Sequence, residues 1–243
     1  MYNLLPTNKN YCMKKKYATI RILSWIFLIL MLFNGESWGQ TYYDMSLGDK
    51  TWNFSDIANW TNNFTSGVDA SNWSSVGIIG TGNSVTTGTR TTKSSATFVT
   101  TTTGGIQKGA QSLVFLSTGS TTTPEAVAVD LLLDFTNRNA GNLSLDWTAI
   151  DNNSGTRPTS LRIFWSVDGT TFTEIVGAQI LDQVSPAAGT ISGVALPSDF
   201  NNSSTARLRF YNHAGNNSTG SGSRDKLQID NITVTSTSTS SCS

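Results

Sequence analysis

The sequence predicts an all-β protein, and three observations lead to that class. From residue 40 onward no segment keeps a sustained apolar period of 3.6 residues. Short apolar runs alternate instead with clusters of Gly, Asn, Ser and Thr, which is typical of antiparallel sandwiches and barrels. Threonine is abundant, and its β-branched side chain favours strands even where it is polar. The predicted fold is therefore an antiparallel β-sandwich preceded by one N-terminal signal-peptide helix.

The N-terminal helix belongs to a signal peptide predicted over residues 1–39. Lysines at 14–16 precede an apolar run over 20–33, and Ser37-Trp-Gly39 supplies the small residues of a cleavage site. The apolar run is shorter than the roughly 20 residues that span a bilayer as a stable helix. The alternative is an uncleaved segment that anchors the protein in the membrane. Met13 is an alternative start, because it would begin a compact signal peptide by itself.

Composition narrows the classes of function and the compartment. The chain has 243 residues, of which 16 are Lys or Arg and 16 are Asp or Glu. Removal of residues 1–39 takes away five cations and one anion, which leaves a net charge of −4. Such a product lacks the basic surface of a nucleic-acid binder. Only Cys242 would remain, so no intrachain disulfide is expected in a protein predicted to be secreted or at the cell surface.

Individual strands are clearest in the second half of the chain. Apolar and polar residues alternate over 143–148 and 161–167, and the second run enters Asp168-Gly169, a hairpin-turn dipeptide. The continuous apolar run at 126–135 predicts a strand that is covered on both faces. Further strands are expected at 41–45, 76–79, 96–100, 113–117, 172–176, 207–211 and 227–234.

The domain organisation follows from these strands and from two polar segments. The sandwich is predicted over 40–235, and residues 236–243 are predicted to be a Ser/Thr-rich linker or a truncated end. Residues 84–103 contain 13 Ser or Thr residues in 20, and the pattern fits either a mobile loop or an edge hairpin.

Five short motifs in one order give the sequence a family resemblance. They are YDM at 43–45, LSLDW at 143–147, SVDGTTF at 166–172, ARLRF at 206–210 and IDNITV at 229–234. This order resembles the MAM-like and LamG-like jelly-roll modules of exported Bacteroidota proteins. The resemblance covers residues 41–235, and it implies a jelly-roll sandwich with an adhesion, glycan-binding or accessory role.

The resemblance also implies a structural calcium ion that joins the first strand to the last. The matching acids are Asp44 and Asp230, with Asp49 and Asp225 as weaker candidates. Calcium takes six to eight oxygen ligands, so carboxylates from both ends of the domain would suit it. The alternative is that Asp44 and Asp230 are strand-end or bulge residues whose carboxylates accept hydrogen bonds from nearby backbone N–H groups.

Aromatic residues crowd the segment after the first strand, and they suggest a glycan site. Trp52, Trp60 and Trp73 lie there among Gly and Asn, together with two phenylalanines. Indole faces stack on the CH faces of sugars, so these tryptophans are the predicted polysaccharide-binding residues. The alternative is that they fill the core, because exposed tryptophan is uncommon.

Catalytic side chains are scarce in the predicted mature chain. It has one histidine, His213, and two glutamates, Glu125 and Glu174, and it contains no nucleophile elbow, zincin pair or phosphate-binding loop. His213 is predicted to lie in a solvated loop. We therefore expect no enzymatic activity from this segment.

The remaining polar feature is a stripe of Arg207, Arg209 and Tyr211 on the non-core parity of one strand. It predicts either a surface for an acidic ligand or a solvated sheet face. The sequence thus predicts an exported, non-catalytic binding or adhesion module, with glycan as partner and calcium as structural cofactor. The alternatives are a spacer domain of a larger surface protein and an accessory domain of a hydrolase whose catalytic part is absent.

Overall fold

The computed structural model describes residues 41–61, 64, 66–76, 104–117, 126–213 and 220–239. The predicted signal peptide, the Ser/Thr-rich segment and the strand expected at 96–100 lie outside the described residues. Within the described ranges, no helix is long and apolar enough to cross a membrane.

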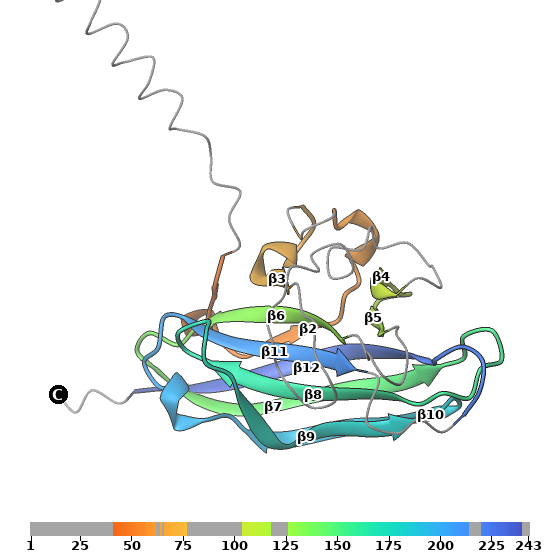
Figure 1. Cartoon of the computed structure of the whole chain (residues 1–243). Helices are drawn as coiled ribbons and strands as arrows, with labels where there is room; N and C mark the ends of the chain where they lie inside the picture. The colour runs from red at the N-terminus through yellow and green to blue at the C-terminus, as the bar shows by residue number, and fades with distance from the viewer. Residues whose placement is uncertain are drawn as a thin grey trace, which may run out of the picture. The chain divides into compact units, whose positions relative to one another are not determined.

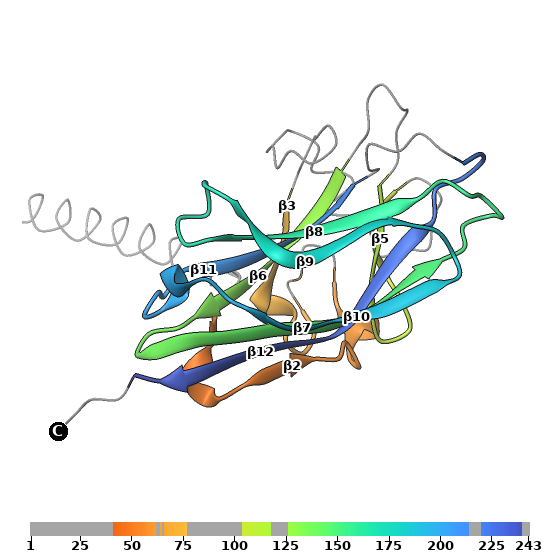
Figure 2. The same cartoon turned by 90° about the horizontal axis from the view of Figure 1, so that it is seen from below.

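Two mostly antiparallel sheets face each other across one core, which confirms the predicted all-β sandwich (Figure 1 and Figure 2). Sheet A has the order β1 (Tyr43–Asp44), β6 (Ala126–Asp134), β11 (Ala206–His213), β8 (Thr159–Ser166) and β9 (Thr173–Gln183), with β3 (Trp73–Val76) also paired to β6. Sheet B has the order β10 (Ala187–Ala195), β7 (Arg138–Ile150), β12 (Lys226–Ser238), β5 (Leu113–Leu116) and β4 (Gly105–Lys108), with β2 (Lys50–Trp52) paired to β12. From β6 onward, every connection except the β8–β9 hairpin crosses between the sheets, as in a jelly roll.

Strand β6 is the predicted strand that is covered on both faces. It pairs with β11 over eight residues and also with β1 and β3, so it lies inside sheet A. Leu131 and Leu133 point into the sandwich core, whereas Ala128 and Asp130 point outward, and all four are buried. Neither face of such a strand contacts water, so neither set of alternate positions needs polar residues, and the sequence is continuously apolar.

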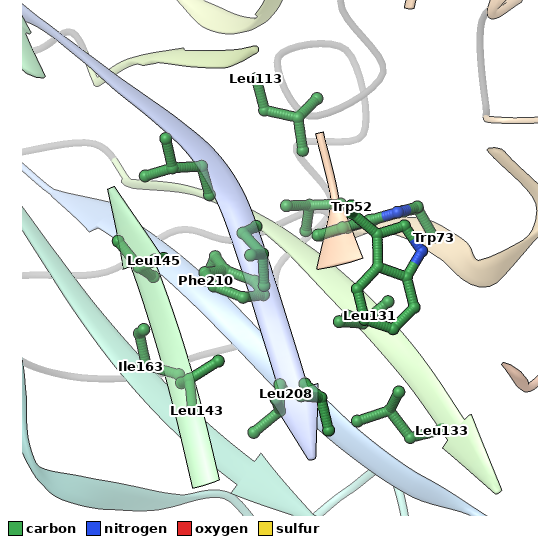
Figure 3. Packing of buried hydrophobic residues seen from close by; sticks show 14 of the residues in the cluster. Trp52, Trp73, Leu113, Leu131, Leu133, Leu143, Leu145, Ile163, Leu208 and Phe210 are labelled. Carbon is green, nitrogen blue, oxygen red and sulfur yellow. The ribbon is translucent and has the colours of Figure 1, made fainter. Parts of the chain in front are cut away.

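The core is formed by the side chains that point inward from both sheets. Leu208 and Phe210 of sheet A lie opposite Leu143 and Leu145 of sheet B, and all four side chains are fully or almost fully buried (Figure 3). The apolar side chains on one face of each strand are thereby removed from water, and this hydrophobic burial is the main term that stabilises such a fold.

A β-bulge in β12 explains an irregular spacing in its sequence. Ile229 and Ile232 are both buried although they are three residues apart, which an unbroken strand would not allow. The pairing of β12 with β7 shifts between Asp230 and Thr233, and Asn231 has a left-handed φ of 47°. The bulge therefore returns the second half of the strand to the core parity.

Several strands differ from the sequence prediction: β2, β4 and β10 were not predicted, β3 begins at Trp73 rather than at 76, and β12 is longer than expected. β10 has only Ile191 buried among small and polar residues, so its sequence carries no apolar alternation at the sheet edge. β12 continues into the predicted linker, because Ser236 and Ser238 pair with Ala140 and Arg138 of β7. Residues 236–238 are therefore strand, held by long-range pairing rather than by an apolar pattern.

Candidate binding site on the outer face of sheet A

The three tryptophans predicted to bind sugar are buried in the core. Trp52 is 1% exposed, Trp60 is 3% exposed and Trp73 is 0% exposed. The indoles of Trp52 and Trp60 lie 6.3 and 6.4 Å from that of Trp73, and Phe54 and Phe64 complete the cluster. Figure 3 shows Trp52 and Trp73 beside one another inside the sandwich. The rings offer no exposed face for a sugar, so the core alternative accounts for their placement.

The two aspartates proposed for calcium lie in different sheets. The Asp44 carboxylate, at the end of β1 in sheet A, accepts a hydrogen bond of 2.8 Å from the Ser46 backbone N–H. Hydrogen bonds from Ser46 lower the pKa of Asp44. Asp230 lies in sheet B at the bulge and accepts a 2.7 Å hydrogen bond from the Asn231 backbone N–H. Burial raises the pKa of Asp230, and its register neighbour Asp146 adds to that rise.

The beginning of the domain is joined to the last strand by hydrogen bonds. The Asp49 carboxylate accepts a 2.8 Å hydrogen bond from the backbone N–H of Ser236 in β12. The Ser236 hydroxyl donates to the Met45 carbonyl at 3.4 Å. In the part of the chain that the structure describes, no three acidic, His or Cys side chains gather as a metal site. Asp44 and Asp230 each accept a backbone hydrogen bond, which is the arrangement of the alternative, and the structural calcium ion stays a prediction.

Thermal unfolding in excess EDTA is expected to match unfolding in millimolar CaCl₂. A bound ion would stabilise the folded state by mass action, whereas carboxylates that only accept backbone hydrogen bonds need no ion. Differential scanning calorimetry of the protein in both buffers measures this. Asp49→Ala should lower both midpoints alike, because its hydrogen bond is independent of calcium. A midpoint that rises with calcium concentration would contradict the hydrogen-bonded arrangement.

The outer face of sheet A carries the stripe that the sequence showed on β11. Leu208 and Phe210 point into the core, so Arg209, Tyr211 and His213 point to the other side of the sheet. These three side chains are only 3%, 0% and 2% exposed. Arg209 and Tyr211 of the stripe are therefore not solvated, whereas Arg207 is half-buried, and His213 is the last residue of β11 rather than a loop residue.

Arg209 forms a buried ion pair with Asp130 of the neighbouring strand. The two residues are direct register partners. Arg209 Nε donates to Asp130 Oδ1 at 2.7 Å, and Nη2 donates to Oδ2 at 2.9 Å. Burial raises the pKa of Asp130, and the hydrogen bonds from Arg209 oppose that rise. The Arg209 guanidinium lies 3.5 Å from the ring centre of Phe172, which the β8–β9 hairpin brings over the face.

Aromatic rings surround this ion pair on the same face. Tyr211 packs edge-on against Phe164 of β8, with ring centres 5.8 Å apart. Its register partner on β6 is Ala128, and the small alanine leaves room for the two rings. Burial raises the pKa of Tyr211 to about 12. Burial together with two neighbouring arginines lowers the pKa of His213 to about 4, so this histidine is neutral at pH 7.

The polar network continues from Tyr211 toward the sheet edge at β9. Arg162 is the register partner of Tyr211 on β8, and its Nη1 donates to Glu174 Oε1 at 2.7 Å. Gln179 donates to the same oxygen at 2.6 Å. The Arg162 and Glu174 side chains are 12% and 27% exposed, and Gln179 is exposed. The face is thus buried at β11 and opens at β9.

We call this group the outer-face site. Its members share the outward parity of sheet A or fold over it, and they are Asp130, Phe164, Arg162, Phe172, Glu174, Gln179, Arg209 and Tyr211. The sequence showed the β11 part of the site as a stripe of two arginines and a tyrosine. It also held an unused signal, because Asp130 is the only charged residue between Ala126 and Leu133 in an otherwise apolar run.

Comparisons with known proteins show only distant likenesses. No family model matches the sequence, and no curated protein matches it either. A family 22 carbohydrate-binding module of Clostridium thermocellum is 11% identical, with 75% of this chain and 94% of that chain covered at a TM-score of 0.34. A mannan-recognising family 27 module is 13% identical, with 71% and 92% covered at 0.35. An adhesin domain of Lys-gingipain from Porphyromonas gingivalis is 13% identical, with 53% and 75% covered at 0.34. These likenesses do not establish a MAM-like or LamG-like family.

Proposed function

We propose that this protein is an exported, non-catalytic β-sandwich module that binds a glycan at the outer-face site. One observation carries the proposal. Phe172 is half-buried over one sheet face, and the same face carries Arg162, Glu174 and Gln179 at its open edge, where their polar groups are fixed by hydrogen bonds. Sites for small polar ligands combine apolar walls with a few oriented polar groups, and a sugar needs both for its CH faces and its hydroxyls.

Preorganisation of the polar groups supports the same proposal. Glu174 accepts hydrogen bonds from Arg162 and Gln179, so all three side chains are held in place before any ligand arrives. A preordered site loses less side-chain entropy on binding, which raises affinity without new contacts. Because the face opens at β9, we place the entry of the sugar chain beside Glu174 and Gln179.

Export through the predicted signal peptide, a location outside the cell and a relationship to MAM-like or LamG-like modules belong to the same proposal. An adhesive role would follow if the glycan lies on another surface. The buried tryptophans have no part in it.

Binding to a panel of plant, algal and bacterial polysaccharides, measured by affinity electrophoresis and calorimetry, tests the proposed function. At least one polymer should bind. Phe172→Ala and Gln179→Ala should each weaken that binding by about tenfold, as expected for one lost stacking or hydrogen-bonding partner.

Gln228→Ala is the matched control for Gln179→Ala. Gln228 lies on β12 between the core residues Leu227 and Ile229, so its side chain points to the outer face of sheet B. This variant should bind like the unchanged protein. Equal losses in both glutamine variants, or no binding to any polymer, would refute the proposed site and favour a spacer role.

A further inference from the structure

The outer-face site contains three buried hydrogen-bond donors that lack acceptors. They are Arg209 Nη1, Tyr211 Oη and Arg162 Nε, and none of them has a hydrogen-bond partner among the residues that the structure describes. A buried polar group without a partner is costly, and each such group in a native fold calls for an explanation.

The three donors are neighbours on one face. Arg209 and Tyr211 are two residues apart on β11, so their side chains share the outward parity. Arg162 is the direct register partner of Tyr211 on β8, and such partners have Cβ atoms about 5 Å apart. The three groups therefore border one small region of the sheet.

Each arginine already uses at least one other nitrogen for an ion pair, which narrows where its free donor lies. Arg209 uses Nε and Nη2 for Asp130, so its free Nη1 lies on the side away from that pair. Arg162 uses Nη1 for Glu174 and keeps Nε free. Guanidinium nitrogens donate only, and they remain charged at any physiological pH.

We propose that the outer-face site recognises the anionic group of an acidic sugar, a carboxylate or a sulfate ester. The inference rests on the proposed glycan-binding function and specifies its ligand class. A neutral sugar hydroxyl brings a proton of its own, whereas a carboxylate or sulfate oxygen only accepts. Two charged donors and a phenol are therefore better satisfied by an anion, which only accepts hydrogen bonds, than by a sugar hydroxyl. The low pKa of His213, caused by burial and then by neighbouring Arg162 and Arg224, is consistent with a positive potential there.

Isothermal titration with oligogalacturonate, and with the same oligomer as its methyl ester, tests the charge of the ligand. Sulfated galactan and its desulfated form make the second arm, which separates a carboxylate from a sulfate ester. We expect one acid to bind at least about tenfold more tightly than its neutral counterpart, as a charge-assisted hydrogen bond requires. Equal binding of acid and neutral forms overturns the anionic inference and leaves the glycan-binding function standing. If no form of either polymer binds, the anionic inference is overturned. The proposed function would still stand if a neutral polymer of the wider panel binds.

Tyr211→Phe is the decisive variant, because it removes one hydroxyl and keeps the ring. That hydroxyl has no partner within the described ranges, so the unliganded melting temperature should stay the same or rise. Affinity for the acidic oligomer should fall several-fold, and Arg162→Gln should abolish the preference for the acid over its neutral form. A Tyr211→Phe protein with lower stability and unchanged affinity would show that the hydroxyl serves the fold rather than a ligand, and would overturn the inference.

Discussion

Replacing Trp73 by alanine is expected to lower the free energy of unfolding by about 3–5 kcal/mol. Trp73 is fully buried, and its ring lies 5.5 Å from Phe54 and 5.6 Å from Phe210. Trp52 and Trp60 contact it from two further sides. Because Trp73 belongs to sheet A and Trp52 to sheet B, the alanine variant would open a cavity between the two sheets.

Urea denaturation followed by circular dichroism measures this loss. Trp73→Phe should cost less, because the phenyl ring fills part of the cavity and the indole N–H has no hydrogen-bond partner in the described part of the chain. Val176→Ala is the control, since Val176 is 88% exposed and its loss should change stability by less than about 0.5 kcal/mol. A Trp73→Ala protein that is equally stable but loses glycan binding would restore the surface platform predicted from the sequence.

The sequence alone was enough to predict the fold class and the strands whose two faces differ in polarity. In β8 and β11 apolar core-facing residues alternate with outward-facing residues that include arginines, and this alternation is visible in the chain although most outward positions are buried too. β6 is visible for the opposite reason, because both of its faces are covered. β10 was missed because it lies at an edge with one buried apolar residue. β10 pairs with β7 through backbone hydrogen bonds, and such bonds require no apolar pattern in the sequence.

The site was less predictable than the fold because burial depends on long-range pairing. Trp73 is inside because its strand pairs with Leu131, and nothing near Trp73 in the sequence specifies that partner. Arg209 appeared solvated because its counter-charge, Asp130, lies 79 positions away in an apolar run. A lone acid in a strand covered on both faces is a usable signal, since burial of an unpaired charge would be prohibitive.

Asp130→Asn is expected to destabilise the protein by about 3–5 kcal/mol, because it leaves the Arg209 guanidinium buried without a counter-ion. The pair is 1% and 3% exposed at the side chains, so water cannot compensate for the lost charge. Urea denaturation at neutral pH measures the loss, with Gln228→Ala as a surface control. A loss below about 1 kcal/mol would show that Arg209 has another buried acceptor.

The double variant Asp130→Leu with Arg209→Met separates the stability of the ion pair from its function. Replacement of a whole buried pair by apolar residues of similar volume is often neutral or stabilising. We therefore expect the double variant to recover most of the stability that Asp130→Asn loses, which a double-mutant cycle would register as a coupling energy of about 2–3 kcal/mol. Binding of the acidic oligomer should not recover, because Arg209 Nη1 is gone. A stable double variant without affinity would show that the pair is retained for its ligand, whereas one that binds normally would remove Arg209 from the site.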